Sequence, residues 1–192
     1  MEEKAEIHKN IVSIPLALII NLVGIIVTAI SIYLPWWNML DNTIGPLQTI
    51  HLYKSTMVMP YKKEYVWMVQ NPVLKASMLT PFLLIILSLI LSITNIIYYK
   101  MKGKKAASAL SFISSAALIA SFFVFKSEFE RYMAGINESI TGATGYLHWG
   151  YGLGWKLALV AAVLMIIVGL MQLFQTGRFE FEVMFEKETE AT

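Results

Sequence analysis

Four long apolar runs constrain this chain more than any other feature, because each is about as long as a helix needs to cross a lipid bilayer. They cover residues 11–34, 77–99, 106–125 and 155–175. A helix rises about 1.5 Å per residue, so about 20 apolar residues span the roughly 30 Å of hydrocarbon. We therefore predict an all-α integral membrane protein, a four-helix transmembrane bundle that forms a single domain over residues 1–192.

The composition supports this class and excludes several others. Hydrophobic residues occupy 57% of the 192 positions and charged residues only 15%, which is unusual for a soluble chain. The net charge of +2 is too small to indicate nucleic-acid binding. The chain has no cysteine, so disulfides, thiolate metal sites and thiol nucleophiles are excluded. Loops without disulfides, together with many isoleucines and lysines, favour a prokaryotic origin.

A lysine-rich turn between the second and third runs predicts the orientation in the membrane. Residues 100–105 carry four lysines beside a predicted span, and short basic turns of this kind stay on the cytoplasmic side. Both termini and the tail 176–192 would then be cytoplasmic, and the loops 35–76 and 126–154 external. We therefore expect a multi-pass protein of the plasma membrane. Asn137, which begins an Asn-Glu-Ser glycosylation sequence, falls in an external loop.

The two external loops carry different signals. In the first, polar and apolar residues alternate from Thr49 to about Met59, which predicts a strand that ends before Pro60. A loop of this length without structure is uncommon, so we expect a small external loop subdomain with short strands. In the second loop, five glycines between Gly142 and Gly154 predict an irregular, closely packed backbone.

Four spans, a long strand-bearing first loop that opens with Trp36 and Trp37, and a shorter second loop together resemble the layout of claudin and tetraspan proteins. The resemblance is one of topology. The Trp-Gly-Leu-Trp-Cys-Cys type of motif is absent, and the chain has no cysteine with which to form it. No activity and no site residue follows from this resemblance.

Small and amide side chains within the apolar runs indicate how the helices pack. The residues predicted to mediate this packing are Ser111, Ser115, Ala116, Ala120, Asn21 and Asn95. The serines and the alanines are each paired at the spacing that lets membrane helices approach closely, so the third run is predicted to be the most buried helix. The two asparagines lie deep in the first and second runs, where an amide usually links two helices by a hydrogen bond. The alternative is a serine-lined polar path.

The sequence contains no arrangement of residues that indicates catalysis. The central parts of the four runs lack Asp, Glu, Lys, Arg and His, which proton relays and ion pumps need at mid-depth. Neither a Gly-x-Ser-x-Gly nor a His-Glu-x-x-His motif is present. We therefore predict a non-enzyme with no catalytic residue and no cofactor, unless the chain is a subunit of an enzyme complex.

One metal site remains as an alternative: copper bound by His51, Met57 and Met59 in the first external loop. An imidazole and two thioethers suit copper, and Met-x-Met on a strand places both residues on the same face. Against this, the chain has 11 methionines, most of which serve as apolar filler. The sequence therefore favours no metal site.

The C-terminal tail has the alternating pattern of a half-buried strand. Phe179, Phe181, Val183 and Phe185 share one side, and glutamates occupy much of the other. Because a lone strand is unstable in water, we predict that this partner-contact tail adds to a partner's sheet edge or pairs with a second copy. Within the same chain, only the N-terminal tail lies on the same side of the membrane. The alternative is a tail that lies on lipid or stays disordered.

These features lead to three hypotheses about function. The first is a non-catalytic accessory or scaffolding subunit of a membrane protein complex. Its partners would be the lipid bilayer and other membrane subunits or a second copy of itself, but not nucleic acid. The second is a small carrier or channel for a neutral or apolar molecule, lined by the serine-rich third run and by Asn21 and Asn95. The third is a subunit that helps shape a quinone or copper site in a membrane redox complex.

Overall fold

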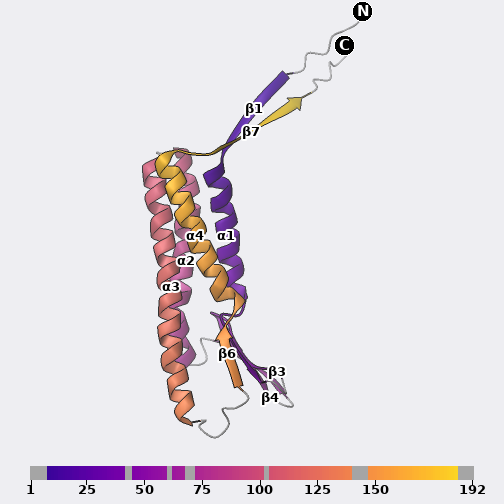
Figure 1. Ribbon diagram of the computed structural model, residues 1–192, viewed down its shortest axis with the longest axis vertical. Coiled ribbons are helices and arrows are strands. Elements are labelled where there is room, and N and C mark those ends of the chain that lie inside the picture. The colour runs from indigo at the N-terminus through magenta and orange to yellow at the C-terminus, as the bar shows by residue number, and fades with distance from the viewer. Residues whose placement is uncertain are drawn as a thin grey trace, which may run out of the picture.

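The computed structural model describes residues 8–41, 45–59, 62–67, 72–101, 104–139 and 147–185. Its helices are α1 (Leu16–Tyr33), α2 (Pro72–Met101), α3 (Lys104–Ser139) and α4 (Leu153–Phe174). Its strands are β1 (His8–Pro15), β2 (Trp37–Asp41), β3 (Gly45–Ile50), β4 (Lys54–Met59), β5 (Lys62–Trp67), β6 (Leu147–Tyr151) and β7 (Arg178–Phe185). Figure 1 shows the helices in one bundle, with a β-sheet at one end and a two-stranded ribbon of β1 and β7 at the other. We call these the sheet end and the ribbon end.

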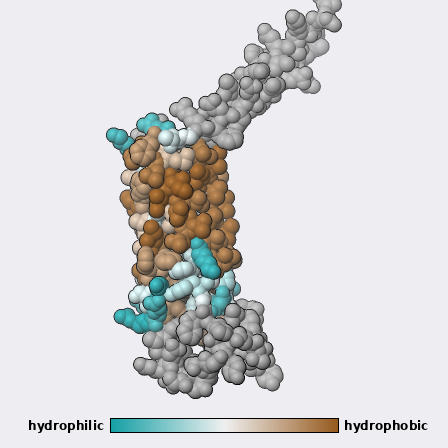
Figure 2. Space-filling model, in the orientation of Figure 1, coloured by the Kyte–Doolittle hydropathy of each residue, from teal (hydrophilic) through white to brown (hydrophobic). Residues whose placement is uncertain are grey.

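All four helices are long and apolar enough to span a membrane, which confirms the four-helix architecture predicted from the apolar runs. Figure 2 shows hydrophobic residues over the middle of the visible face of the bundle and hydrophilic residues toward its two ends. Large apolar side chains such as Leu22, Ile90 and Val163 are about half exposed on this surface. An apolar surface of this extent is typical of a bundle solvated by lipid. The four candidate spans indicate a multi-pass membrane protein, and the described residues add β-structure, of which short strands in the first loop were predicted.

The four helices form a closed bundle in which each helix packs against two neighbours. α2 packs on α3, α3 on α4 and α4 on α1, while α1 and α2 share a smaller contact. Half of the apolar stretch of α3 is buried, compared with 28% for those of α1 and α2, so α3 is the most buried helix as predicted. Small residues permit this close approach. At Gly169 of α4, for example, a Cβ would lie 3.0 Å from the ring of Phe112 in α3.

At the sheet end, five antiparallel strands form one sheet in the order β5-β4-β3-β2-β6. The first loop supplies four of these strands and the second loop supplies β6, so the segment predicted to be irregular contains a strand that pairs with β2. This placement explains how two loops far apart in the sequence form one small subdomain.

The single strand predicted in the first loop is in fact a hairpin. β3 ends at Ile50 and β4 begins at Lys54, because the N–H of His51 donates to the carbonyl oxygen of Lys54 (2.8 Å) and closes a tight turn. β4 ends at Met59, directly before Pro60, as the missing N–H of proline predicts.

At the ribbon end, β1 and β7 pair antiparallel over their whole length. The first apolar run begins at residue 11, but α1 begins at Leu16 because the residues before it pair with the tail instead. Pro15 occupies the N-cap position of α1, where a missing N–H removes no helical hydrogen bond. The tail therefore pairs within the chain with the N-terminal tail. Pairing with another chain stays a prediction.

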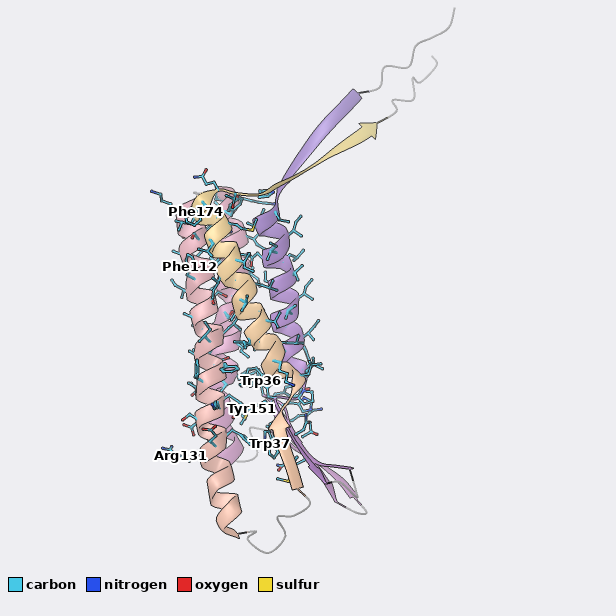
Figure 3. The ribbon with its side chains drawn as sticks, in the orientation of Figure 1. Trp36, Trp37, Phe112, Arg131, Tyr151 and Phe174 are labelled. Atoms are coloured by element: carbon cyan, nitrogen blue, oxygen red, sulfur yellow. The ribbon has the colours of Figure 1, made fainter. Side chains whose placement is uncertain are left out.

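Aromatic side chains attach the sheet to the bundle (Figure 3). Trp36 and Trp37 follow α1 and are 0% and 1% exposed. The indole N–H of Trp36 donates to the carbonyl oxygen of Ser31 (2.7 Å), and its ring lies against Phe125 of α3, with centroids 5.1 Å apart. Trp37 lies against Phe129, with centroids 4.5 Å apart. The sheet is thus anchored on the part of α3 nearest to it.

Two glycines complete this junction: Gly152, the N-cap residue of α4, and Gly154 in its first turn. The N–H of Gly152 donates to the carbonyl oxygen of Trp36 (2.9 Å), and that of Gly154 donates to Pro35 (2.8 Å). A Cβ at Gly154 would lie 2.7 Å from the carbonyl oxygens of Ser31 and Leu34. Only a residue without a side chain fits this close backbone approach, so α1 and α4 are locked together at the sheet end.

Candidate functional site

Buried polar side chains form a hydrogen-bonded network across the bundle, with Asn95 of α2 at its centre. The Nδ2 of Asn95 lies 2.8 Å from Ser111 Oγ and 2.9 Å from Gln172 Oε1, and it also contacts the carbonyl oxygen of Ala107. The Oδ1 of Asn95 accepts from Gln172 Nε2 and from Asn21 Nδ2, each at 2.9 Å. One fully buried amide therefore links α1, α3 and α4 to α2.

Asn21 joins α1 to this network and keeps one hydrogen-bonding atom unused. The residue is fully buried, and its Nδ2 also donates to the carbonyl oxygen of Ser92 (3.1 Å). Its Oδ1 accepts no hydrogen bond from any described residue. A buried acceptor without a donor costs about 1–3 kcal/mol. This oxygen is therefore available to accept a hydrogen bond from a further donor, such as a buried water or a polar group.

Serines extend the network along the bundle toward the sheet end. The hydroxyl oxygens of Ser88 and Ser92 lie 2.7 and 2.8 Å from that of Ser114. Ser108 and Ser115 of α3 instead donate to backbone carbonyl groups of α4, at 2.8 and 3.0 Å. Each hydroxyl thereby makes a bond between two helices.

The network lies in the half of the bundle nearer the ribbon. Asn21, Asn95 and Ser111 are five to seven residues from the ribbon-end termini of their helices, or roughly 8–10 Å along the axis. Toward the sheet end, the interior is filled by Ile85 and Leu118, which are 0% and 1% exposed. The hydrogen-bonded network between helices therefore ends at an apolar layer, and the buried hydroxyls beyond it, such as that of Ser121, bond within their own helices.

The chemistry open to this network follows from its residue types. None of the buried polar side chains in the described residues is ionisable. The network can hold helices together and can hydrogen-bond a neutral group, but its side chains cannot carry a proton by titration. The described residues also contain no group of three or more His, Cys, Asp or Glu able to hold a metal ion.

The structure brings together four of the residues predicted to mediate packing, and it separates the other two from them. Asn21, Asn95, Ser111 and Ser115 all make hydrogen bonds between helices. The remaining pair is different: Ala116 is exposed and Ala120 is half-buried. The spacing of this alanine pair places both residues on one face of α3, but it does not predict whether another helix packs against that face.

Sequence reasoning missed the network roles of Ser88, Ser92 and Ser114, whereas Gln172, like the two asparagines, was predicted to link helices by a hydrogen bond. The signal was present in the spacing. Ser88, Ser92 and Asn95 are four and three residues apart, which places them on one face of α2. A polar face on a helix that is otherwise apolar must meet other polar groups, and this indicates a network rather than isolated links.

A second group of polar side chains lies at the sheet end, around His51. Its Nδ1–H donates to the carbonyl oxygen of Tyr33 at the end of α1 (2.8 Å), and its ring lies 5.7 Å from that of Tyr53. Burial lowers the pKa of His51 from its ordinary value of 6.5, and the charge of Lys54 lowers it further, while backbone hydrogen bonds to Tyr33 and Leu34 raise it. His51 is therefore a neutral side chain that joins the hairpin to α1.

The copper alternative is not tested at this position. Met57 and Met59 are alternate residues of β4, as expected, but their side chains lie outside the described part of the structure. The other histidine at the sheet end, His148, is in β6, on the far side of β2 from the strand that precedes His51. The two histidines therefore do not belong to one site.

A stack of aromatic rings covers the junction of β6 and α4. Tyr151 stacks on Trp155 with centroids 4.3 Å apart, and Trp155 stacks on Phe122 of α3 at 3.8 Å. Burial raises the pKa of Tyr151 above its ordinary value of 10.0, and so do the charge of Glu130 and the hydrogen bond that the phenol donates to it. The stack ties β6 to the same part of α3 that holds Trp37.

The tail residues Phe179, Phe181, Val183 and Phe185 all lie in β7, where they are alternate residues and so share one face of the ribbon. Their side chains lie outside the described part of the structure.

Compared with known proteins, the chain matches no protein-family model and no curated protein sequence. Function is therefore inferred from the geometry of the chain itself.

Proposed function

We propose that the chain is a plasma-membrane protein with both termini in the cytoplasm, and that it acts as a non-catalytic accessory or scaffolding subunit of a membrane complex. The orientation is supported by Lys100 and Lys105, which flank the turn between α2 and α3 at the ribbon end. Cationic residues in such a turn favour the cytoplasmic side.

The observation that carries the accessory role is the closed polar interior. The buried amides and hydroxyls bond to one another or to backbone carbonyl groups, and no buried side chain among the described residues is ionisable. Such an interior makes a stable support and supplies no general acid, base or charged relay. The β-structures at the two ends extend beyond the apolar bundle and are the parts suited to contact other proteins.

Two experiments test this proposal. The first is extraction of the native protein in a mild detergent and identification of chains that co-purify in fixed ratio. Recovery of the chain without any other protein in fixed ratio contradicts the role as a subunit of a larger complex. A four-span protein of unrelated sequence, expressed to the same level, controls for chains that bind any apolar bundle.

The second experiment tests orientation and uses the absence of cysteine from the chain. The variants Lys105→Cys and Lys126→Cys place one exposed thiol at each end of the bundle. A membrane-impermeant maleimide should label the Lys126→Cys variant in intact cells, and the Lys105→Cys variant only after the membrane is opened. The reverse pattern would invert the proposed topology.

A second candidate function is a carrier for a small neutral molecule, and the unpaired Oδ1 of Asn21 favours it. This acceptor lies within a polar network that serines extend along the bundle. Flux of a neutral solute into liposomes that depends on Asn21 and Ser111 would support this candidate. Flux that is unchanged by Asn21→Leu and by Ser111→Ala would remove it, and Thr94→Val serves as the control because Thr94 bonds within its own helix.

A further inference from the structure

The register of the ribbon places apolar residues on one face. Opposite residues of an antiparallel pair share a face, and so do alternate residues of each strand. Ile14 is opposite Phe179 and Val12 is opposite Phe181. The same face continues to Val183 and Phe185, which are opposite Asn10 and His8. The other face carries most of the charge: Lys9, Arg178, Glu180 and Glu182. The ribbon is therefore amphipathic across its thickness.

This ribbon is fixed to the bundle and stands away from it. β1 passes into α1 without a linker, and the N–H of Leu16 donates to the carbonyl oxygen of Gly177 (3.2 Å), which ties both strands at the base. Figure 1 shows the ribbon rising from the end of the bundle instead of folding back along the helices. A two-stranded ribbon is marginally stable in water, so its apolar face needs a covering surface.

The charge of the sequences that flank the ribbon argues against a lipid surface as the partner of its apolar face. The sequences that flank the ribbon, residues 1–7 and 186–192, each contain three glutamates and one lysine. At the proposed cytoplasmic end they would be repelled by the anionic lipids of the inner leaflet. Amphipathic elements that lie on membranes instead carry lysine and arginine on the polar face.

We propose that the apolar face of the ribbon binds the same face of a second copy of this chain. The proposal rests on the proposed function for the placement of both copies in one membrane with the same orientation. Two such copies are related by an axis along the membrane normal, which brings identical faces together. The charged faces then remain in water on the outside of a four-stranded stack.

The area that this face can bury approaches what a stable dimer needs. A buried phenylalanine contributes about 150–250 Å², so the three in β7 supply roughly 450–750 Å² per copy. A stable interface of standard size buries about 800 Å² per partner. Val12, Ile14 and Val183 add to the aromatic area on the same face.

Cross-linking of adjacent residues on opposite faces tests this proposal. Val12→Cys places a thiol near the centre of the apolar face, and Ser13→Cys places one on the charged face at the next residue. Each full-length variant is reconstituted into nanodiscs that hold two copies and is oxidised with copper phenanthroline. We expect the Val12→Cys protein to form disulfide dimers at least about tenfold faster, because a disulfide requires close and correctly oriented thiols. Equal rates for the two variants would overturn the proposal.

Two further substitutions and a lipid probe separate the remaining outcomes. Phe181→Ser in the Val12→Cys protein should lower the cross-linking rate about tenfold, whereas Glu182→Ser, a change on the charged face, should leave it within about twofold. If a fluorophore on the Val12→Cys protein is quenched by spin-labelled lipid in discs holding one copy, the face lies on the membrane and the proposal is wrong. A dimer without other co-purifying chains supports this inference and contradicts the accessory role in a larger complex. A monomer within a larger complex contradicts this inference and supports the accessory role.

Discussion

Replacement of Asn95 by leucine should destabilise the bundle by about 2–3 kcal/mol. The Nδ2 of Asn95 has two hydrogens and so donates at most two hydrogen bonds, and its Oδ1 accepts two, which gives at most four. Hydrogen bonds between side chains in membrane proteins contribute about 0.6 kcal/mol each, which gives roughly 2.4 kcal/mol. The change also leaves the Nε2 of Gln172 without an acceptor among the described residues.

The free energy of unfolding can be measured by steric trapping in bicelles. The control is Thr94→Val, one residue away, because its Oγ1 bonds only to the carbonyl oxygen of Ile90 in the same helix (2.7 Å). We expect this control to stay within about 0.5 kcal/mol of the wild type. An equally small effect of Asn95→Leu would refute the argument that the network holds the helices together.

The double variant Asn95→Leu/Gln172→Leu refines the same prediction. Removal of both partners no longer leaves the Nε2 of Gln172 without an acceptor, although Asn21 still loses the bond to Asn95. Replacement of a whole polar pair by apolar groups can be nearly neutral. The double variant should therefore lose about 1 kcal/mol less than the sum of the single losses. Simple additivity would mean that the two residues do not act as one unit.

Three further predictions follow from single positions. Gly154→Ala should lower the free energy of unfolding by about 1–3 kcal/mol because its Cβ would meet backbone oxygens at 2.7 Å, whereas Gly150→Ala, with nothing within 4 Å, should be nearly neutral by the same assay. Since burial lowers the pKa of His51, its contribution to stability should be present above pH 6.5 and lost as the pH falls through the lowered pKa; NMR titration of wild type and His51→Gln would check this. Gly177→Ala should loosen the ribbon, because Gly177 has a φ of +78° and a Cβ there would lie 2.6 Å from Met171 Cε, and limited proteolysis of β7 should become faster.

The helices could be predicted from the sequence because their signal is local. About twenty apolar residues in a row have few other stable conformations in lipid, so the four spans follow directly. Asn21 and Asn95 could be recognised for the same reason, since an amide within an apolar run needs a partner. What the sequence did not reveal is which partner each amide would choose, because that depends on the rotation of every helix about its axis.

The β-structure could be predicted only in part because strand pairing is a long-range property. The pattern from residue 49 to 59 indicated extended backbone but not the turn at His51 that divides it. The strand β6 was hidden in a glycine-rich segment, and its partner β2 lies more than one hundred residues earlier. The first apolar run similarly concealed the boundary at Pro15, because Ile11, Val12 and Ile14 are as compatible with a strand as with a membrane helix.

The tie between Leu16 and Gly177 gives the ribbon a particular place in the order of folding. β1 precedes α1 and β7 follows α4, so the ribbon can form only after all four helices have been synthesised. Until then, β1 is an extended apolar segment without its neighbour, exposed to chaperones and proteases. A chain that stops before β7 would therefore leave β1 without the strand that it pairs with in the complete ribbon.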